Sequence, residues 1–414
     1  MKIAFINQPW SVAAPPQGSD STGIWTYRIA RCLVHFHQVI FYGCQSKDKK
    51  SNYCHDGIHY RAVSLIFDDI LRPIRTLENK LKLNRKLPYF ASTLFYFGYI
   101  LQVALDLRRQ QCDIIHIHNF SQFVPIIRAF NPRAKIVLHM HCEWLTQLNR
   151  EAIARRLERA DLIIGCSNHI TNKIRDRFPS LAARCQTVYN GVDTTHFVPN
   201  NHQTTISSKD KPRLLFVGRV SPEKAIHLLI DAFVEVVKHY PQAQLEIIGP
   251  EAIVGKEFLT DLSDDPQITA LAPFYSGSYL AHLKNRISPD LAPQIQFTGS
   301  LQQEKLLQHY WEADIVINPS LSEAFGMSLV EGMACEKPVI GARVGGMTEA
   351  IAPEVTGLLF ESGNATALAD AIVELLSDEQ RRTSMGKAGR KRVTEMFSWE
   401  QIAQSLLEQY QSIL

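Results

Sequence analysis

Short apolar runs alternate with helical stretches along the whole chain. The runs are mostly continuous rather than alternating, which is typical of parallel strands that are covered on both faces. Helical stretches such as 22–36 and 151–159 separate them. This order predicts an α/β fold with a doubly wound sheet. The strands predicted in the first half are 2–7, 38–42, 58–63, 113–118, 135–141, 161–166 and 186–189.

Polar residues interrupt this rhythm at 196–213, with the sequence HFVPNNHQTTISSKDKPR. Such a stretch between two patterned segments predicts a linker, which we assign to 196–212. The alternation then restarts, so the sequence predicts two Rossmann-like domains, at 1–195 and 213–395, followed by a C-terminal helix within 396–414. The strands predicted in the second half are 214–218, 245–249, 295–299, 314–320 and 338–342.

Composition excludes several classes of protein. With 414 residues and 45% hydrophobic residues, the chain can bury a core in each domain, unlike a disordered, collagen-like or disulfide-stapled protein. Lys plus Arg number 44 against 41 Asp plus Glu, for a net charge of +3. A dedicated nucleic-acid-binding protein would be more basic, so we expect no nucleic-acid partner.

The cysteines and the N-terminal residues favour a cytoplasmic protein. None of the eight cysteines form a C-x-x-C pair, which argues against a zinc or thioredoxin-like site. The start, MKIAFINQPW, lacks the features of a signal peptide. The segment 87–105 has 19 residues without a charge, close to the length that spans a bilayer. Strand–helix alternation continues on both sides of it, so we interpret it as a buried helix.

The segment 318–346 contains the strongest cluster of candidate residues. A strand end leads into a loop with Glu323 and then a helix with Glu331, eight residues on, which would place both on one helical face. An anion before this helix would be stabilised by its dipole and its first N–H groups. An ordinary amphipathic helix with solvated glutamates fits the same pattern. The N–H groups concerned belong to Phe325, Gly326 and Met327.

A second cluster is FVGRVSPEKA at 216–225, where Arg219 and Lys224 follow a predicted strand end and a glycine. Two cations at the start of a helix can bind a diphosphate without a metal ion. An exposed Arg and Lys after a strand are also common, so the pattern alone is weak.

Together these motifs resemble the retaining GT-B glycosyltransferases of family four. The resemblance rests on GRVSPEKA, IQFTG, the Glu323–Glu331 spacing, KPVIGARVGGMTEAI and FSWE, and on DIIHIHN, KIVLHMH and YNGVD in the first half. It covers nearly the whole chain, and the joint order of the motifs is specific. It departs from the family at 250–278, where an insertion follows IIG.

The resemblance implies two Rossmann-like domains that face each other across a cleft, an N-terminal one for the acceptor and a C-terminal one for a nucleotide sugar. It also implies that the C-terminal helix crosses back to the first domain. The implied catalytic residues are Glu323, His141, Arg219 and Lys224. The implied donor-binding residues are Gly23 in the loop after the first strand, Arg219, Lys224, Glu323, Ala324, Phe325, Gly326, Met327 and Glu331.

His141 is the histidine that matches the family residue near the transferred sugar, and His118 is a second choice. Histidines on strands are more often hydrogen-bonded core residues than catalysts. His141 is preferred because it ends a predicted strand.

The implied reaction is transfer of a hexose, with retention, from a nucleotide sugar to a glycan or lipid-linked acceptor of bacterial polysaccharide synthesis. UDP-glucose is the first candidate donor and GDP-mannose the second, with no cofactor. The chain has no D-x-D motif, so we expect no metal site. A sugar-nucleotide epimerase and an inactive nucleotide-sugar binder remain alternatives, whereas the absence of G-x-G-x-x-G after the first strand argues against an oxidoreductase.

The segment LRPIRTLENKLKLNRK at 71–86 has six basic residues and one acidic residue, with leucines and Ile74 on one helical face. Aromatic residues follow it up to residue 90. A basic amphipathic helix of this kind fits an anionic membrane surface, which would make the protein peripheral on the inner face. A solvated basic face over a core stripe fits equally well.

Overall fold

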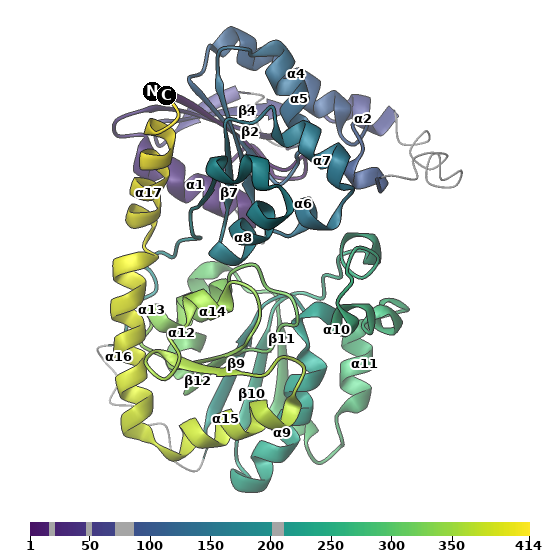
Figure 1. Cartoon of the computed structure of the whole chain (residues 1–414). Coiled ribbons are helices and arrows are strands. Elements are labelled where there is room, and N and C mark those ends of the chain that lie inside the picture. Colours follow the sequence, from purple (N-terminus) through teal and green to yellow (C-terminus); the bar gives the residue numbers. More distant parts are fainter. Residues whose placement is uncertain (16–20, 47–51, 71–86, 201–210) are drawn as a thin grey trace. The chain divides into compact units, whose positions relative to one another are not determined.

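The computed structural model divides into two compact units (Figure 1). The first unit comprises Met1–Tyr189 and Trp399–Leu414, and the second comprises Asn190–Ser398. The structure describes residues 1–15, 21–46, 52–70, 87–200 and 211–414.

The first unit is built on an eight-stranded sheet with the order β3-β4-β2-β1-β5-β6-β7-β8. All neighbouring strands are parallel except β3 and β4, which form an antiparallel pair at one edge. The order reverses between β1 and β5, as in a doubly wound sheet. The strands are β1 (Lys2–Ile6), β2 (Gln38–Cys44), β3 (Asn52–His55), β4 (Ile58–Val63), β5 (Ile114–His118), β6 (Lys135–Met140), β7 (Leu162–Gly165) and β8 (Cys185–Thr187).

Helices pack around this sheet, and some of them also pack against one another. The first helix, α1, packs against the last, α17, and α4 packs against α5. The helices are α1 (Ser21–Leu33), α2 (Ile66–Ile70), α4 (Phe97–Gln110), α5 (Phe123–Phe130), α6 (Trp144–Gln147), α7 (Arg150–Leu157), α8 (Asn168–Arg177) and α17 (Trp399–Gln411), with 3₁₀ turns η1 (Tyr89–Ala91) and η2 (Pro179–Arg184).

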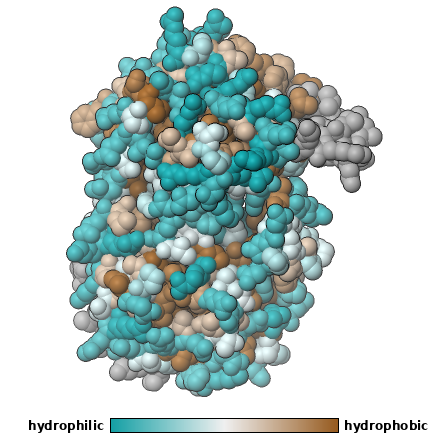
Figure 2. Space-filling view, in the orientation of Figure 1, coloured by the Kyte–Doolittle hydropathy of each residue, from teal (hydrophilic) through white to brown (hydrophobic). Residues whose placement is uncertain are grey.

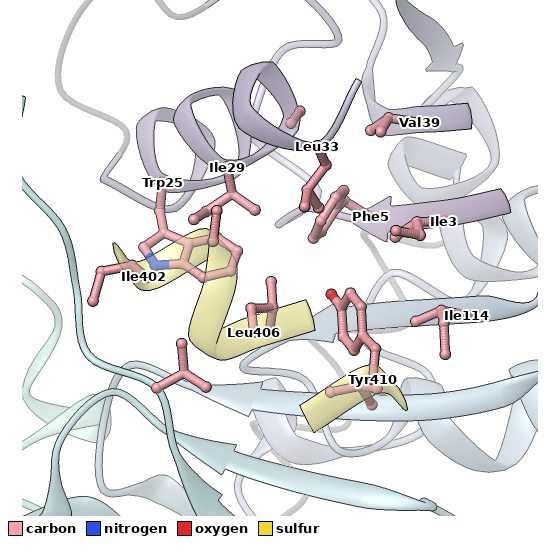
Figure 3. Close-up of a cluster of buried hydrophobic side chains, with 14 of the residues drawn as sticks. Ile3, Phe5, Trp25, Ile29, Leu33, Val39, Ile114, Ile402, Leu406 and Tyr410 are labelled. Atoms are coloured by element: carbon pink, nitrogen blue, oxygen red, sulfur yellow. The ribbon is translucent and has the colours of Figure 1, made fainter. Parts of the chain in front are cut away.

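The C-terminal helix α17 completes the core of the first unit (Figure 3). Its residues Ile402, Leu406 and Tyr410 recur at helical spacing and pack with Trp25 of α1 and Phe5 of β1. Leu406 and Tyr410 are fully buried. The apolar face of α17 is therefore a structural part of this unit, although 209 residues of the second unit (190–398) separate it from β8 and the rest of the unit.

The second unit has a six-stranded sheet, parallel throughout, with the order β11-β10-β9-β12-β13-β14. This is the Rossmann order, and it reverses between β9 and β12. Its strands are β9 (Arg213–Val217), β10 (Gln244–Ile248), β11 (Ile295–Gly299), β12 (Ile315–Asn318), β13 (Val339–Ala342) and β14 (Gly357–Phe360). Its helices are α9 (Ile226–His239), α10 (Pro266–Thr269), α11 (Tyr279–Arg286), α12 (Gln303–Glu312), α13 (Met327–Ala334), α14 (Met347–Ala350), α15 (Ala365–Ser377) and α16 (Glu379–Met396), with η3 (Pro222–Lys224), η4 (Lys256–Phe258), η5 (Ala272–Tyr275) and η6 (Ala292–Gln294).

The predicted α/β class is confirmed in both units, but two strands were missed. The edge strand β3 has the sequence NYCH, which is polar and largely exposed, so it carries no signal of a buried strand. The other, β14, is a four-residue strand at the opposite edge of the second sheet. The predicted helix at 71–86 lies outside the described residues.

The predicted start of the linker at residue 196 is wrong. Phe197 is fully buried, and its ring meets Tyr310 of α12 edge to face at 5.6 Å. The backbone carbonyls of Thr194 and Phe197 also accept hydrogen bonds from Arg390 of α16. These contacts tie the chain around residue 197 to the second unit. The rest of the predicted linker, 201–210, lies outside the described residues.

The uncharged segment 87–105 forms the turn η1 and then the first half of α4. Tyr99, Ile100, Val103 and Ala104 of α4 are fully buried against the first unit. Among the described residues, the structure has no helix with the length and apolarity needed to cross a membrane. The face in Figure 2 is largely hydrophilic, with hydrophobic residues in small groups.

Replacing Leu406 by alanine should destabilise the first unit by about 2–5 kcal/mol, because a fully buried leucine leaves a cavity that the core fills only partly. Urea denaturation followed by circular dichroism measures the loss. Leu414→Ala at the C-terminus, where the residue is 59% exposed, is the matched control and should change little. A Leu406→Ala variant as stable as the control would show that α17 is not needed for this core.

Candidate active site

The loops after β9 and β12 meet at the point where the strand order of the second unit reverses. In open α/β sheets, ligands bind beyond the carboxyl ends of the strands at this point. The loop after β9 carries Arg219 and Lys224, and the loop after β12 carries Glu323. Because β9 and β12 pair directly, the topology brings the two predicted clusters together.

Lys224 and Glu323 form a buried ion pair. The Lys224 Nζ lies 2.7 Å from Glu323 Oε2, and each side chain is 16% exposed. The same carboxylate oxygen accepts a hydrogen bond from the amide of Asn318 at 3.3 Å, and Oε1 accepts one from the Phe325 N–H at 3.4 Å. Glu323 therefore connects the end of β12, the start of α13 and the lysine of the neighbouring loop.

These contacts decide the charge of Glu323. Burial alone would raise the pKa of its carboxyl, but the charge and hydrogen bond of Lys224, with the Phe325 and Asn318 donors, outweigh it and lower the pKa. Glu323 is therefore ionised at neutral pH and acts as a hydrogen-bond acceptor.

Two glycines after β13 allow the Glu323 loop to pack closely. Gly345 has a φ of +52°, and a Cβ there would lie 1.8 Å from the Glu323 carbonyl oxygen. The N–H of Gly346 donates to that carbonyl at 3.2 Å. Any other side chain at Gly345 would displace the loop, so the motif GARVGG serves to position Glu323.

Arg219 is held by a glutamate that the sequence analysis missed. Glu223 is 4% exposed, and its Oε1 accepts hydrogen bonds from Arg219 Nη2 and Ser221 Oγ, each at 2.7 Å. Arg219 Nη1 also donates to the carbonyl of Ala252 at 3.2 Å. The sequence did contain a signal for this contact. Glu223, the acidic residue beside Lys224 in SPEKA, lies four residues after Arg219, with which it forms an ion pair.

The insertion at 250–278 packs onto the same loop. Val220 donates its N–H to the carbonyl of Pro250 at 2.8 Å, and Leu271 joins Ala225 and Leu321 in a small apolar cluster. Its Tyr275 is close enough to Glu223 for the charge of that carboxylate to raise the pKa of the phenol, after the larger effect of burial. The insertion therefore forms part of the wall around Arg219.

Glu331 lies on α13, and the prediction that it shares a helical face with Glu323 is wrong. The helix begins at Met327, so Glu323 belongs to the preceding loop. The Glu331 Oε2 accepts a hydrogen bond from the hydroxyl of Tyr310 at 2.6 Å. Burial raises the pKa of Glu331 to about 7, although the Tyr310 hydrogen bond opposes the shift.

The comparisons with known proteins agree with this geometry. A family model described as "Glycosyl transferases group 1" matches residues 197–392, and one described as "Glycosyltransferase Family 4" matches residues 22–196. The chain belongs to glycosyltransferase family 4. The resemblance to family-four glycosyltransferases, and the GT-B fold of two Rossmann-like domains that it implied, are thereby confirmed.

Relatives of this glycosyltransferase act on different substrates. The lipopolysaccharide 1,2-N-acetylglucosaminetransferase of Salmonella typhimurium is 27% identical, over 99% of this chain and 97% of its own. A D-inositol 3-phosphate glycosyltransferase of Corynebacterium urealyticum is 27% identical over 64% and 61% of the two chains.

Solved structures share the fold of the glycosyltransferase. Sucrose-phosphate synthase from Thermosynechococcus elongatus superposes with a TM-score of 0.75 at 21% identity, over 100% of this chain and 98% of that one. The Anabaena protein HepE, in complex with UDP-glucose, gives a TM-score of 0.69 at 18% identity, over 100% of both chains.

Two predicted residues of the glycosyltransferase lie in the first unit. His141 follows directly after β6, at the carboxyl edge of the sheet, as expected for a ligand-facing position. Gly23 was expected in a loop, and this is wrong: it is the third residue of α1 and is buried in its first turn. The nearby residues 16–20 lie outside the described residues.

Three buried histidines, His116, His118 and His139, have ring nitrogens within 4.8 Å of one another and could in principle hold a metal ion. Most of their ring nitrogens are engaged in hydrogen bonds: His116 with Tyr410 at 2.7 Å and with His139 at 3.2 Å, and His118 with Thr26 at 2.9 Å. The Nε2 of His139 is buried without a hydrogen-bond partner among the described residues. Burial holds the pKa of all three well below the ordinary value. They are neutral residues of a largely hydrogen-bonded core.

Glu331→Gln should stabilise the protein at alkaline pH. Because the folded state raises the pKa of Glu331 from 4.5 to about 7, it binds the proton more tightly than the unfolded chain does. Stability therefore falls as pH rises from about 4.5 to 7. The variant should exceed the parent by about 1–3 kcal/mol at pH 8, and by little at pH 4.5, in urea denaturation.

The control for this variant is Glu304→Gln, at an exposed position on α12, which should change stability little at either pH. An equal effect of Glu331→Gln at both pH values would contradict a raised pKa at Glu331.

Proposed function

We propose that this protein is a retaining hexosyltransferase that moves a hexose from a nucleotide sugar to a glycan or lipid-linked acceptor in the synthesis of a bacterial polysaccharide. The reaction is proposed to need no metal ion. The observation that carries the proposal is the buried Lys224–Glu323 pair beside Arg219, at the ligand-binding edge of the second sheet.

Arg219 and Lys224 are held in place by hydrogen bonds and still have N–H groups that can bind a diphosphate. Within the described residues, hydrogen bonds use two of the five guanidinium N–H groups of Arg219 and one of the three ammonium protons of Lys224. The remaining donors can bind phosphate oxygens without breaking the bonds to Glu223 and Glu323. Preorganised donors of this kind stabilise charge that develops on a leaving diphosphate, the task a metal ion performs in other enzymes.

The donor is proposed to be UDP-glucose, with GDP-mannose as the second candidate. Support comes from HepE, which shares the fold and was solved with UDP-glucose. Glu331, half-buried and linked to Tyr310, is proposed to accept hydrogen bonds from the ribose hydroxyls. Ionised Glu323 and the backbone at Ala324, Phe325, Gly326 and Met327 are proposed to hold the hexose hydroxyls.

Retention of configuration is proposed to proceed on one face of the sugar. The donor's bond between the anomeric carbon and the diphosphate oxygen breaks, and the acceptor oxygen forms a bond to the same carbon from the same side. The acceptor proton passes to the departing diphosphate oxygen. Both carboxylate oxygens of Glu323 already accept hydrogen bonds, Oε2 from Lys224 and Asn318 and Oε1 from the Phe325 N–H, so its proposed role is to bind hydroxyls rather than to attack the sugar.

The first unit is proposed to bind the acceptor at a membrane surface. On α2, Ile66, Phe67 and Ile70 are 63–66% exposed. They directly precede the basic segment 71–86, which lies outside the described residues. Exposed apolar residues next to clustered Lys and Arg favour peripheral association with anionic lipid on the cytoplasmic side.

Isothermal titration with UDP-glucose, GDP-mannose and ADP-glucose, in EDTA throughout, tests the donor. We expect micromolar binding of UDP-glucose and no change when Mg²⁺ replaces EDTA, because the cations come from Arg219 and Lys224. Binding that requires Mg²⁺ would contradict a metal-independent site. Binding followed by isomerisation of the donor without an acceptor would identify an epimerase instead.

Lys224→Ala and Glu323→Ala should each lower kcat by about 10²–10³-fold, since removing one preorganised charge contact from the transition state costs about 3–4 kcal/mol. Transfer of radiolabelled hexose to membrane-extracted acceptors measures this. The matched controls are Lys238→Ala and Glu235→Ala, which break an exposed ion pair on α9 and should leave kcat unchanged. Full activity in both site variants would refute the proposed function.

A further inference from the structure

The loop that follows β1 carries an exposed tryptophan at the carboxyl edge of the first sheet. Trp10 lies four residues after the end of β1, and 45% of it is exposed. The strand order of this sheet reverses between β1 and β5. In open α/β sheets, this reversal marks the place where ligands bind beyond the strand ends. A large exposed indole at this place is therefore a candidate for contact with a ligand.

The backbone around Trp10 forms a closed turn. The Ser11 N–H donates to the Gln8 carbonyl at 2.8 Å, which closes a β-turn with Pro9 and Trp10 at its centre. Proline at the first central position restricts the backbone to the conformation that such a turn needs. The position of the indole is therefore set by a turn of low conformational freedom.

The chain after the turn pairs with the end of β2. The Cys44 N–H donates to the Ser11 carbonyl at 2.7 Å, and the Ala13 N–H donates to the Cys44 carbonyl at 3.0 Å. Gly43 permits this approach, since a Cβ there would lie 2.5 Å from the Ser11 carbonyl oxygen. Because the loop is fixed on this side as well, a ligand does not have to order it on binding.

Aromatic residues from neighbouring elements support the indole. Trp10 meets Phe120, two residues after β5, at a centroid distance of 5.6 Å and an interplanar angle of 89°. It meets Tyr96, just before α4, at 6.3 Å and 63°. Phe95 contacts both of these rings, at 5.7 Å from Phe120 and 4.7 Å from Tyr96. Since both contacts of Trp10 are edge to face, neither partner lies flat on the indole, and ring area remains for a flat ligand.

Two polar side chains of the same turn have no hydrogen-bond partner among the described residues. The hydroxyl of Ser11 is buried and unpaired. Gln8 is buried too, and its side-chain amide makes no hydrogen bond to a described residue. Buried polar groups are normally paired, so these two indicate a partner outside the described chain. Hydroxyl groups can pair with both, because they donate as well as accept.

A sugar ring suits both features of this turn. The C–H groups on one face of a pyranose carry a small positive charge and pack on the electron-rich face of an indole. The hydroxyls at the rim of the ring can exchange hydrogen bonds with an amide or a serine. A lipid chain would cover the indole but leave the buried polar groups unpaired, which costs free energy.

We propose that Trp10 is the surface on which a pyranose ring of the acceptor stacks. The inference rests on the proposed function in one respect, that the first unit binds the acceptor. It narrows the acceptor to a molecule that carries a sugar ring, so a lipid phosphate without a sugar would not be a substrate.

Saturation-transfer difference NMR tests the stacking without donor or transfer. The probes are the methyl β-pyranosides of glucose, galactose and N-acetylglucosamine at millimolar concentration, with the full chain. On irradiation of the aromatic protons, we expect signal at the ring C–H protons of at least one glycoside, and a loss of about fivefold or more in Trp10→Ala. Sorbitol, which has hydroxyls but no ring, should receive no signal.

Three results would overturn the proposal: no signal for any glycoside, an equal signal in the parent and Trp10→Ala, or a signal for 1-hexanol or uridine that depends on Trp10 as strongly as the glycoside signal does. The last would make Trp10 a general apolar contact. Glycoside binding that depends on Trp10, in a protein that transfers no sugar, would contradict the proposed function alone.

In the transfer assay, Trp10→Ala should raise the apparent KM for the membrane-extracted acceptor about tenfold and leave the donor KM unchanged, because the stacking contact is made with the acceptor. Trp10→Phe keeps a flat ring and should stay within about threefold of the parent. The matched control is Phe36→Ala, an exposed aromatic residue between α1 and β2, at the amino edge of the same sheet, which should change neither KM. Equal rises of the donor and acceptor KM in Trp10→Ala would reduce Trp10 to a structural role and overturn the proposal.

Discussion

The buried ion pair between Lys224 and Glu323 is the interaction on which the candidate site depends. It links loops from two neighbouring strands, β9 and β12, and removing either partner would leave an uncompensated charge in a mostly buried place. The surrounding structure is arranged to keep it: Asn318 and the Phe325 N–H bind the carboxylate, and Gly345 lets the backbone approach. The pair thus couples local folding of two loops to the position of both charges.

The first unit also holds buried polar side chains in place, but it does so with neutral groups. Burial at its strand ends is deep enough to keep His116, His118 and His139 uncharged. Order in this cluster comes from the direction of hydrogen bonds, because a neutral imidazole has one donor and one acceptor. One unit therefore holds its polar side chains by paired charges, and the other by hydrogen bonds between neutral groups.

The sequence predicted the strands well where both faces are covered, because there a strand must be continuously apolar. It failed at β3, whose polar residues face solvent at a sheet edge. It also missed β14, which is apolar and largely buried but only four residues long. Arg219, Lys224 and Glu323 could be found from local motifs and a family resemblance. Tyr310 and Thr26 could not, since their roles depend on contacts with Glu331 and His118, which are 21 and 92 residues away. Gly23 was placed in a loop by the family resemblance, although the helical stretch predicted at 22–36 already contained it.

The pairing of Arg219 and Lys224 with carboxylates also affects how strongly the site would bind a diphosphate. Long Lys and Arg side chains lose rotamer freedom when a ligand orders them, at a cost of about 0.5–1.5 kcal/mol each. Glu223 and Glu323 impose that order during folding, so under the proposed function the cost is met before the donor arrives. The carboxylates also cancel the net charge of the two cations, which weakens attraction for any anion. Under the proposed function, selectivity for a nucleotide sugar over free phosphate then has to come from contacts with the sugar and the nucleoside, the part proposed for Glu323, Glu331 and the backbone around Phe325.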